Sequence, residues 1–322
     1  MTSSREIAVA EKSKYKFKEP KTLTWEMSLE RALNSVLHAR PVVLAGPPGT
    51  GKTLMIERII EVLKRENRLG KSAVVQFHRK FSYEDFIEGY SPAANGGFEK
   101  KDGVFKSFCR NPSVKGIDLF VIDEMNRAEL STTFGEVLYA IEDRERRAVI
   151  TAHFKEDLRI PTNLSIIGTI NTADRNIAIM DFALRRRFDF VYVFPDADQL
   201  RKWVNSIGFA FTEFTVDDYV AMFLVLNRRI RYHPLMGFHM QLGHSMFVPR
   251  IHSKPITGIE LSLNFEQVIL PQLEAYCGFG NQSELAIITS PDVANKFLNQ
   301  QVLTLEDLHH LTRDVKNERS ST

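Results

Sequence analysis

The sequence has little cysteine and no long hydrophobic run, and each absence excludes a class of protein. Only two cysteines, Cys109 and Cys277, occur in 322 residues, which are too few for a disulfide framework or a cysteine-based metal site. No apolar stretch approaches the ~18 residues that a membrane-spanning helix needs. The N-terminus lacks the apolar core of a signal peptide. We therefore expect a cytoplasmic protein with no membrane contact.

An excess of charge of one sign is also missing. Lys and Arg number 42 against 40 Asp and Glu, which gives a formal net charge of +2. This balance neither favours nor excludes a polyanionic partner, although local basic clusters can still act. The hydrophobic content of 43% and the charged content of 25% are typical of a soluble globular protein. The length fits one large domain and a smaller one.

Short apolar runs that alternate with helical patterns predict an α/β domain with a parallel sheet. The expected strands are 41–45, 73–77, 117–122, 165–170 and 188–194, and the expected helices are 24–38, 52–65 and 127–143. After residue 195 only helical patterns follow, at 197–206, 215–231, 262–276 and 305–314. We expect a flexible arm over 1–22, a nucleotide-binding α/β domain over 23–195, and a small α-helical lid domain with a C-terminal tail over 196–322.

Residues 46–53 read GPPGTGKT between a strand pattern and a helix pattern, which is the context of a phosphate-binding loop (P-loop). The glycines of such a loop let backbone N–H groups surround a phosphate. Lys52 would bring a positive charge to the β- and γ-phosphates, and Thr53 would offer its hydroxyl to Mg²⁺. The expected nucleotide-binding residues are Gly46, Pro47, Pro48, Gly49, Thr50, Gly51, Lys52, Thr53 and Leu54.

The second motif is IDLFVIDE, an apolar strand that ends in Asp123 and Glu124. This is a Walker B arrangement, in which Asp123 would hold Mg²⁺ and Glu124 would polarise the attacking water. An acidic pair at a strand end is common on exposed surfaces. Together with the upstream P-loop, however, it indicates hydrolysis of a nucleoside triphosphate. Glu124 also argues against a regulatory switch that binds nucleotide without turnover.

A third segment, IIGTINTADRNIAIMDFALRRRFDF, follows the last expected central strand. Asn171 ends that strand, where its amide could contact the γ-phosphate or the water. Arg185, Arg186 and Arg187 follow in a row, and such arginines suit delivery to the nucleotide of a neighbouring subunit. The alternative for each arginine is a solvated basic helix end.

Five segments then resemble one family. FHRKFSYEDFIEGYSP (77–92), DGVFKSFC (102–109), DEMNRAEL (123–130), FGEVLYAIEDRERR (134–147) and IGTINTADRNIAIMDFALRRRF (167–188) are similar to the AAA+ motor subunit McrB of modification-dependent restriction systems. The likeness runs in order from about residue 40 to 195 and continues weakly through GHSMF and LPQLEAY. The Walker motifs alone indicate only the AAA+ class, whereas NTADR and SYEDF narrow it to this branch.

This resemblance implies a P-loop AAA+ GTPase that forms a ring, expected to be a hexamer, and works with a separate McrC-like endonuclease subunit. Asn171, Asp174 and Arg175 would organise the catalytic water and the subunit interface, and Arg186 and Arg187 would be the fingers in trans. The chain shows no nuclease constellation of its own. DNA cleavage would therefore belong to a partner, and DNA would be reached through that partner or another domain.

The alternative is a MoxR-like AAA+ ATPase that remodels proteins. Its P-loop and Walker B chemistry would be the same, and nothing in GPPGTGKT distinguishes guanine from adenine. GTP as the substrate therefore comes only from the resemblance, with ATP as the alternative. Phe81, Tyr83 and Phe86 lie beside Arg79 and Lys80, a pattern that suits base stacking, but packing within the domain is the favoured interpretation. His239 and His244 lack companions at metal-ligand spacing.

Overall fold

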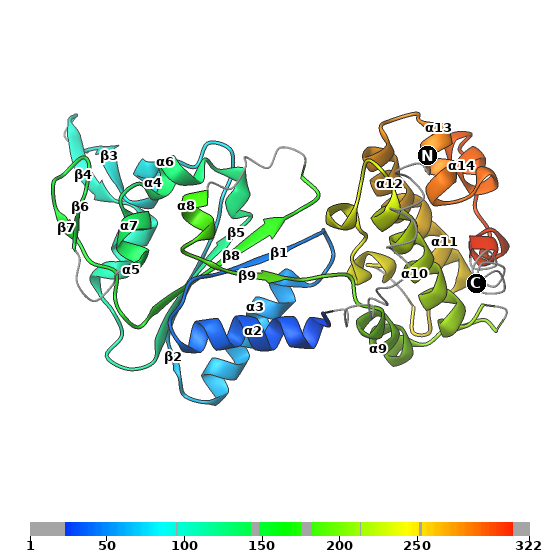
Figure 1. Ribbon diagram of the computed structural model, residues 1–322, viewed down its shortest axis with the longest axis horizontal. Coiled ribbons are helices and arrows are strands. Elements are labelled where there is room, and N and C mark those ends of the chain that lie inside the picture. Colours follow the sequence, from blue (N-terminus) through cyan, green and yellow to red (C-terminus); the bar gives the residue numbers. More distant parts are fainter. Residues whose placement is uncertain are drawn as a thin grey trace, which may run out of the picture.

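The computed structural model describes residues 23–94, 96–142, 148–174, 182–212, 214–250 and 253–311. The expected N-terminal arm and the end of the C-terminal tail lie outside these ranges. Within them, an α/β domain and a helical domain lie side by side along the long axis of the molecule (Figure 1).

The α/β domain is built on a five-stranded sheet in the order β2-β5-β8-β1-β9. Its strands are β1 (Val42–Gly46), β2 (Leu69–Gln76), β5 (Ile117–Asp123), β8 (Leu164–Asn171) and β9 (Asp189–Tyr192). Every pairing between neighbours is parallel. All five strands expected from the sequence are present, and the predicted fold class is confirmed.

The central strands are buried on both faces, which explains their continuous apolar runs. Alternate residues of β1 face opposite layers. Val42 and Leu44 pack in a core with α2 (Trp25–Leu37) and α3 (Lys52–Arg65), whereas Val43 and Ala45 pack in a core rich in phenylalanine. Thr24 caps α2 by accepting the N–H of Met27.

The phenylalanine-rich core carries short helices and two hairpins. The helices are α4 (Tyr83–Phe86), α5 (Val104–Arg110), α6 (Leu130–Phe134), α7 (Val137–Glu142) and α8 (Phe182–Arg185). The sequence predicted one helix over 127–143. The structure instead has a 3₁₀ turn at Met125–Arg127, then α6 and α7, with Gly135 between the two helices at φ 47°. The helix is interrupted at Gly135, whose positive φ is not helical, and a Cβ there would lie 3.0 Å from the Tyr83 ring.

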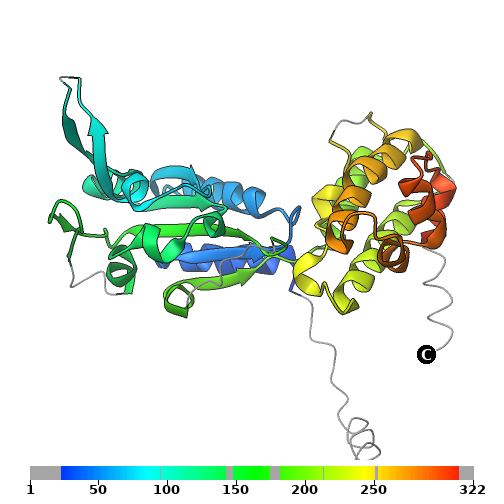
Figure 2. The same ribbon diagram turned by 90° about the horizontal axis from the view of Figure 1, so that it is seen from above.

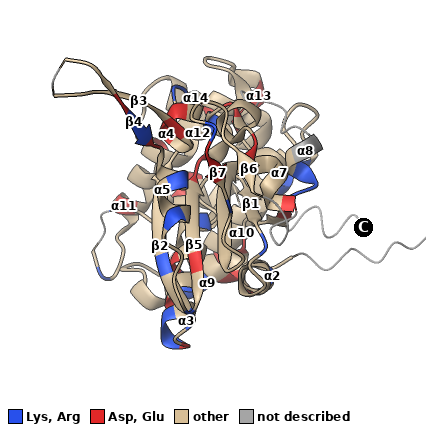
Figure 3. Ribbon diagram, turned by 90° about the vertical axis from the view of Figure 1, so that its left-hand side faces the viewer, with Lys and Arg blue, Asp and Glu red and all other residues tan. Residues whose placement is uncertain are grey.

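Neither hairpin was predicted from the sequence. β3 (Glu88–Pro92) pairs with β4 (Phe98–Asp102), and β6 (Val149–Ile150) pairs with β7 (Asp157–Leu158), both antiparallel. The β3–β4 hairpin projects from the domain (Figure 2), and its strand β4 carries adjacent basic residues (Figure 3). Lys106 joins the two hairpins, because its ammonium group contacts Glu88 at 2.5 Å and Glu156 at 2.8 Å.

The helical domain has its own hydrophobic core. Its helices are α9 (Ala197–Ile207), α10 (Val216–Tyr232), α11 (Gly258–Asn264), α12 (Leu270–Cys277), α13 (Gln282–Ile288) and α14 (Pro291–Leu298), with a further helix at 305–311. The sequence predicted one helix over 262–276. A π-helical segment, Phe265–Ile269, joins α11 to α12 there, because Pro271 has no N–H to continue the α pattern. α13 and α14 were not predicted.

Candidate nucleotide site at the carboxyl ends of the sheet

The P-loop lies between the end of β1 at Gly46 and the start of α3 at Lys52. Gly49 and Gly51 have φ of 75° and 80°, a conformation that side chains with a Cβ rarely adopt. The Thr50 hydroxyl donates to the carbonyl of Pro47 at 3.0 Å and closes the turn. The backbone N–H groups at the start of α3 are thus presented at a helix N-terminus, where an anion is favoured.

Lys52 holds its ammonium group inside this loop. Its Nζ donates to the carbonyl oxygens of Gly46 and Pro47, each at 2.8 Å. Burial lowers the pKa of Lys52 to about 8, although nearby negative charges at Asp123, Glu124 and Asp174 act in the opposite direction. The positive charge of Lys52 in the P-loop therefore interacts with the carboxylates of the Walker B strand and with Asp174 of the NTADR segment.

Asp123 and Glu124 are fixed by a residue of the neighbouring strand β8. The Thr169 hydroxyl donates to Asp123 Oδ1 at 2.6 Å and accepts the backbone N–H of Glu124 at 2.9 Å. Glu124 has φ 52° and turns the chain out of the sheet. Thr169 was not singled out from the sequence. The signal was present, since Thr169 is a polar residue near the end of the expected buried strand SIIGTI.

The start of the NTADR segment lies directly beside the P-loop. Asn171 pairs with Gly46 in the β1–β8 register, and the N–H of Thr172 donates to the Gly46 carbonyl at 3.1 Å. Asn171 Oδ1 accepts the N–H of Ala173 at 3.2 Å. Asp174 raises the pKa of Lys52 by its charge. Asn171 therefore lies beside the P-loop and the charge of Asp174 acts on Lys52, whereas Arg175 lies outside the described residues.

The three consecutive arginines have different surroundings. Arg185 places its guanidinium 5.7 Å from the centre of the Phe190 ring. Arg187 donates to Glu142 on α7 at 2.8 Å, and its side chain is only 16% exposed. Arg186 is exposed. Arg185 and Arg186 are therefore both exposed, with Arg185 also beside an aromatic ring, whereas Arg187 is paired within this chain.

The helical domain contacts the P-loop through residues 243–246, a contact that the sequence did not reveal. Gly243 N–H donates to the Pro48 carbonyl and Ser245 N–H to the Gly49 carbonyl, both at 3.0 Å. A Cβ at Gly243 would lie 1.9 Å from the carbonyl carbon of Gly49, so only glycine permits this approach. The segment holds the helical domain against the loop expected to bind phosphate.

His244 supports this contact from inside. It accepts the N–H of Asp196 on Nδ1 at 3.3 Å and packs edge-on against Trp203. Burial lowers its pKa to about 4, although the charges of Asp196 and Glu26 oppose the shift. His244 is therefore neutral near pH 7, which agrees with its role as an acceptor.

Comparisons with known proteins agree with this geometry. Residues 41–188 match the AAA domain of the dynein-related subfamily. Over 236 residues the chain is 38% identical to the Type IV methyl-directed restriction enzyme EcoKMcrB subunit of Escherichia coli strain K12, an alignment that covers 69% of this chain and 50% of that protein. The chain is a McrB-like AAA+ protein. Hydrolysis of nucleoside triphosphates is the activity of this class.

Two further relatives are more distant. The Type II restriction enzyme BsuMI component YdiS of Bacillus subtilis strain 168 is 24% identical over 53% of this chain and 62% of that protein. Midasin of Giardia intestinalis is 26% identical over 66% of this chain and 4% of that protein. The McrB-like chain thus spans 50% and 62% of the two restriction proteins.

The residues at the McrB-like site fit Mg²⁺, which AAA+ NTPases generally use. Thr53 offers a hydroxyl at the first turn of α3, and Asp123 a carboxylate at the end of β5. Both are hard oxygen ligands of the type that Mg²⁺ prefers together with phosphate oxygens. The charge of Asp123 acts to raise the pKa of Lys52, which agrees with a carboxylate near the P-loop. When bound, the ion would neutralise charge on the phosphates.

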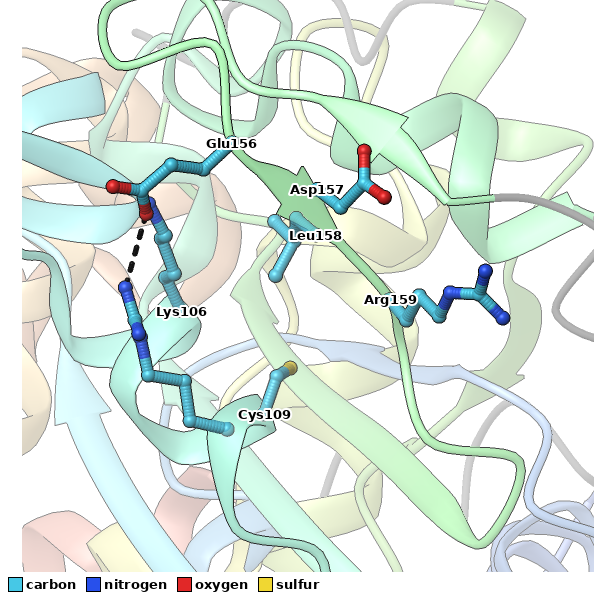
Figure 4. Close-up of a pocket in the computed structure, with 7 residues that line it drawn as sticks. Lys106, Cys109, Glu156, Asp157, Leu158 and Arg159 are labelled. Carbon is cyan, nitrogen blue, oxygen red and sulfur yellow. Dashed lines mark hydrogen bonds and ion pairs between the residues drawn. The ribbon is translucent and has the colours of Figure 1, made fainter.

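Other candidate sites lie elsewhere. A cavity of about 270 Å³ between α5 and β7 (Figure 4) is lined by Lys106, Cys109, Arg110, Glu156, Asp157, Leu158 and Arg159, none of which belongs to the nucleotide motifs.

Phe81, Tyr83 and Phe86 pack in or against the phenylalanine-rich core, which confirms packing over base stacking. Across the residues that the structure describes, no helix is both long and apolar enough to cross a membrane.

Proposed function

We propose that this chain hydrolyses GTP as one subunit of a ring, expected to be a hexamer, and that the ring activates a separate McrC-like endonuclease subunit in the restriction of foreign DNA. One observation carries the proposal. Lys52 donates to the Gly46 carbonyl at the end of β1, and Thr169 on the neighbouring strand β8 holds Asp123 and Glu124 at the end of β5, where β8 leads into the segment that resembles the McrB signature. The 38% identity to the E. coli restriction subunit supports the biological role.

Each residue has a role in the proposed reaction. Lys52 binds the β- and γ-phosphates, and Asn171 orients the water or the γ-phosphate. Glu124 takes a proton from the water while the oxygen of that water forms a bond to the γ-phosphorus. The bond from the γ-phosphorus to the β–γ bridging oxygen breaks, and the products are the nucleoside diphosphate and inorganic phosphate. Asp174 and Arg175 would organise the water and the subunit interface.

Arg186 is the preferred finger in trans. It is exposed, whereas Arg187 is bound to Glu142 within its own chain. An arginine that reaches a neighbour's γ-phosphate stabilises the charge that develops in the transition state. This role makes each site incomplete in a single subunit. DNA would be contacted through the nuclease partner or another domain, since no nuclease constellation is evident in this sequence.

Substrate and base are tested by turnover assays. Wild-type protein with Mg²⁺ should hydrolyse GTP with a higher kcat/KM than ATP, and ATP preference would instead favour a MoxR-like remodelling ATPase. Glu124→Gln should bind nucleotide normally and lose hydrolysis by at least about a hundredfold. Glu57→Gln, on an exposed position of α3, is the matched control and should retain full turnover.

Shared sites are tested by mixing two inactive variants. Lys52→Ala subunits cannot bind phosphate but still carry Arg186, and Arg186→Ala subunits have an intact P-loop. Mixed rings should therefore regain hydrolysis at the sites where the two kinds of subunit meet. If light scattering shows that the mixed subunits form rings and these rings do not hydrolyse GTP, Arg186 is not the finger in trans. Nuclease activation is tested by adding a McrC-like subunit and measuring GTP-dependent cleavage of methylated DNA.

A further inference from the structure

Glu124 is paired with an arginine three residues later. The Arg127 guanidinium donates from Nη2 to Glu124 Oε1 at 3.0 Å, and its Nε contacts Oε2. Both oxygens of the carboxylate are therefore bound by one guanidinium, which is the bidentate geometry that strengthens such pairs. The intervening 3₁₀ turn fixes the spacing, because the N–H of Arg127 donates to the Glu124 carbonyl at 2.9 Å.

The two partners are not held equally. The Glu124 backbone is anchored to Thr169, so its main-chain position is set by the sheet. The Arg127 side chain is 50% exposed, and the Glu124 side chain is 27% exposed. The pair can therefore open by rotation of side chains alone, and Arg127 is accessible to groups from outside the chain.

We propose that Arg127 is a positioning residue that restrains Glu124 and slows hydrolysis in the isolated subunit. The inference rests on the proposed role of Glu124 as the base. A carboxylate that accepts a proton from water must direct an oxygen lone pair at that water. In the bidentate pair Arg127 takes one lone pair of each oxygen and fixes the orientation of the carboxylate, so the pair restrains how Glu124 can be directed at the water.

The size of the effect follows from the exposure of the pair. Ion pairs between partly exposed groups have modest strength, so opening one slows a later step by a small factor. Arg127→Gln should therefore raise the single-turnover rate of GTP hydrolysis about two- to fivefold, while the nucleotide Kd stays within about twofold. Arg127→Lys keeps the charge but loses the bidentate geometry, and should give an intermediate rate.

The experiment compares these variants with Glu124→Gln and with the double variant. Rates are measured at saturating GTP and Mg²⁺, and affinity by titration calorimetry. The double variant should be as inactive as Glu124→Gln, because Arg127 acts only through that carboxylate. The control is Arg58→Gln, which removes another Arg–Glu pair at three-residue spacing, Arg58–Glu61 on α3, and should leave the rate unchanged.

The outcomes separate this inference from the proposed function. If Glu124→Gln is inactive but Arg127→Gln is no faster than wild type, or is slower, the restraint is wrong and the base assignment stands. If Glu124→Gln retains full turnover, the base assignment fails, and the restraint fails with it. A rise in both Arg127 variants that disappears in the Glu124→Gln background supports the proposal, since loss of folding does not raise a rate.

Discussion

The lowered pKa of Lys52 predicts that nucleotide affinity depends on pH. Burial brings this pKa to about 8, and phosphate oxygens close to the ammonium group would raise it again in the complex. Above pH 8 the complex therefore binds more protons than the free protein, so affinity must fall as pH rises. A group with a free pKa of 8 weakens binding by a factor of about 1 + 10^(pH−8), which is about twofold at pH 8 and about tenfold at pH 9.

Titration calorimetry measures this linkage directly. Binding of GTP to the Glu124→Gln variant, which prevents turnover, is measured at pH 8.5 in two buffers with different ionisation enthalpies. The difference should report uptake of about three quarters of a proton per bound nucleotide. Lys52→Met is the control, because it removes the titrating group, and any residual binding should show no such uptake. Equal affinity at pH 7 and pH 9 with no proton uptake would refute the assignment of Lys52 to the phosphates.

Three further predictions concern packing and charge. Gly243→Ala places a Cβ against the Gly49 backbone and should weaken nucleotide binding by about tenfold or more. Ser245→Ala removes one hydrogen bond to Gly49 and should reduce the free energy of nucleotide binding by about 1 kcal/mol. Titration of each variant with nucleotide compares the two effects. Lys106→Met leaves the buried Glu88 carboxylate without its ammonium partner and should destabilise the protein to urea by about 3–5 kcal/mol, with partial recovery in Lys106→Met/Glu88→Gln. Arg187→Ala should lower the midpoint of thermal unfolding, because the packing of a largely buried side chain and its pair with the exposed Glu142 are lost, whereas Arg186→Ala should leave it within about 1 °C and affect only turnover in rings.

The parts of the site that the sequence predicted are those that local motifs specify. The P-loop needs glycines at Gly49 and Gly51 because both have positive φ, and this requirement is visible in GPPGTGKT. Asp123 and Asn171 follow apolar strands, and the carboxyl ends of parallel strands meet at one edge of a sheet, so their convergence was also predictable. The roles of single arginines were not, because RRRF does not show which guanidinium packs on Glu142.

The sequence also failed where packing overrides local pattern. The predicted helix at 127–143 is interrupted at Gly135, which has a positive φ and lies close to the Tyr83 ring, more than fifty residues earlier in the chain. The two hairpins were missed because their strands are short, and because Lys106 joins them through a buried charge network that no sequence period reveals.

The α/β class, the phosphate-binding loop, the acidic pair and the likeness to McrB can all be inferred from the sequence, because each depends on residues close together in the chain. The contacts that complete the site become visible in the folded chain. Thr169 reaches Asp123 and Glu124 from the neighbouring strand, and Ser245 reaches Gly49 from the helical domain. These contacts depend on the order of strands in the sheet and on the close approach that Gly243 permits, and both are set by packing between segments far apart in sequence.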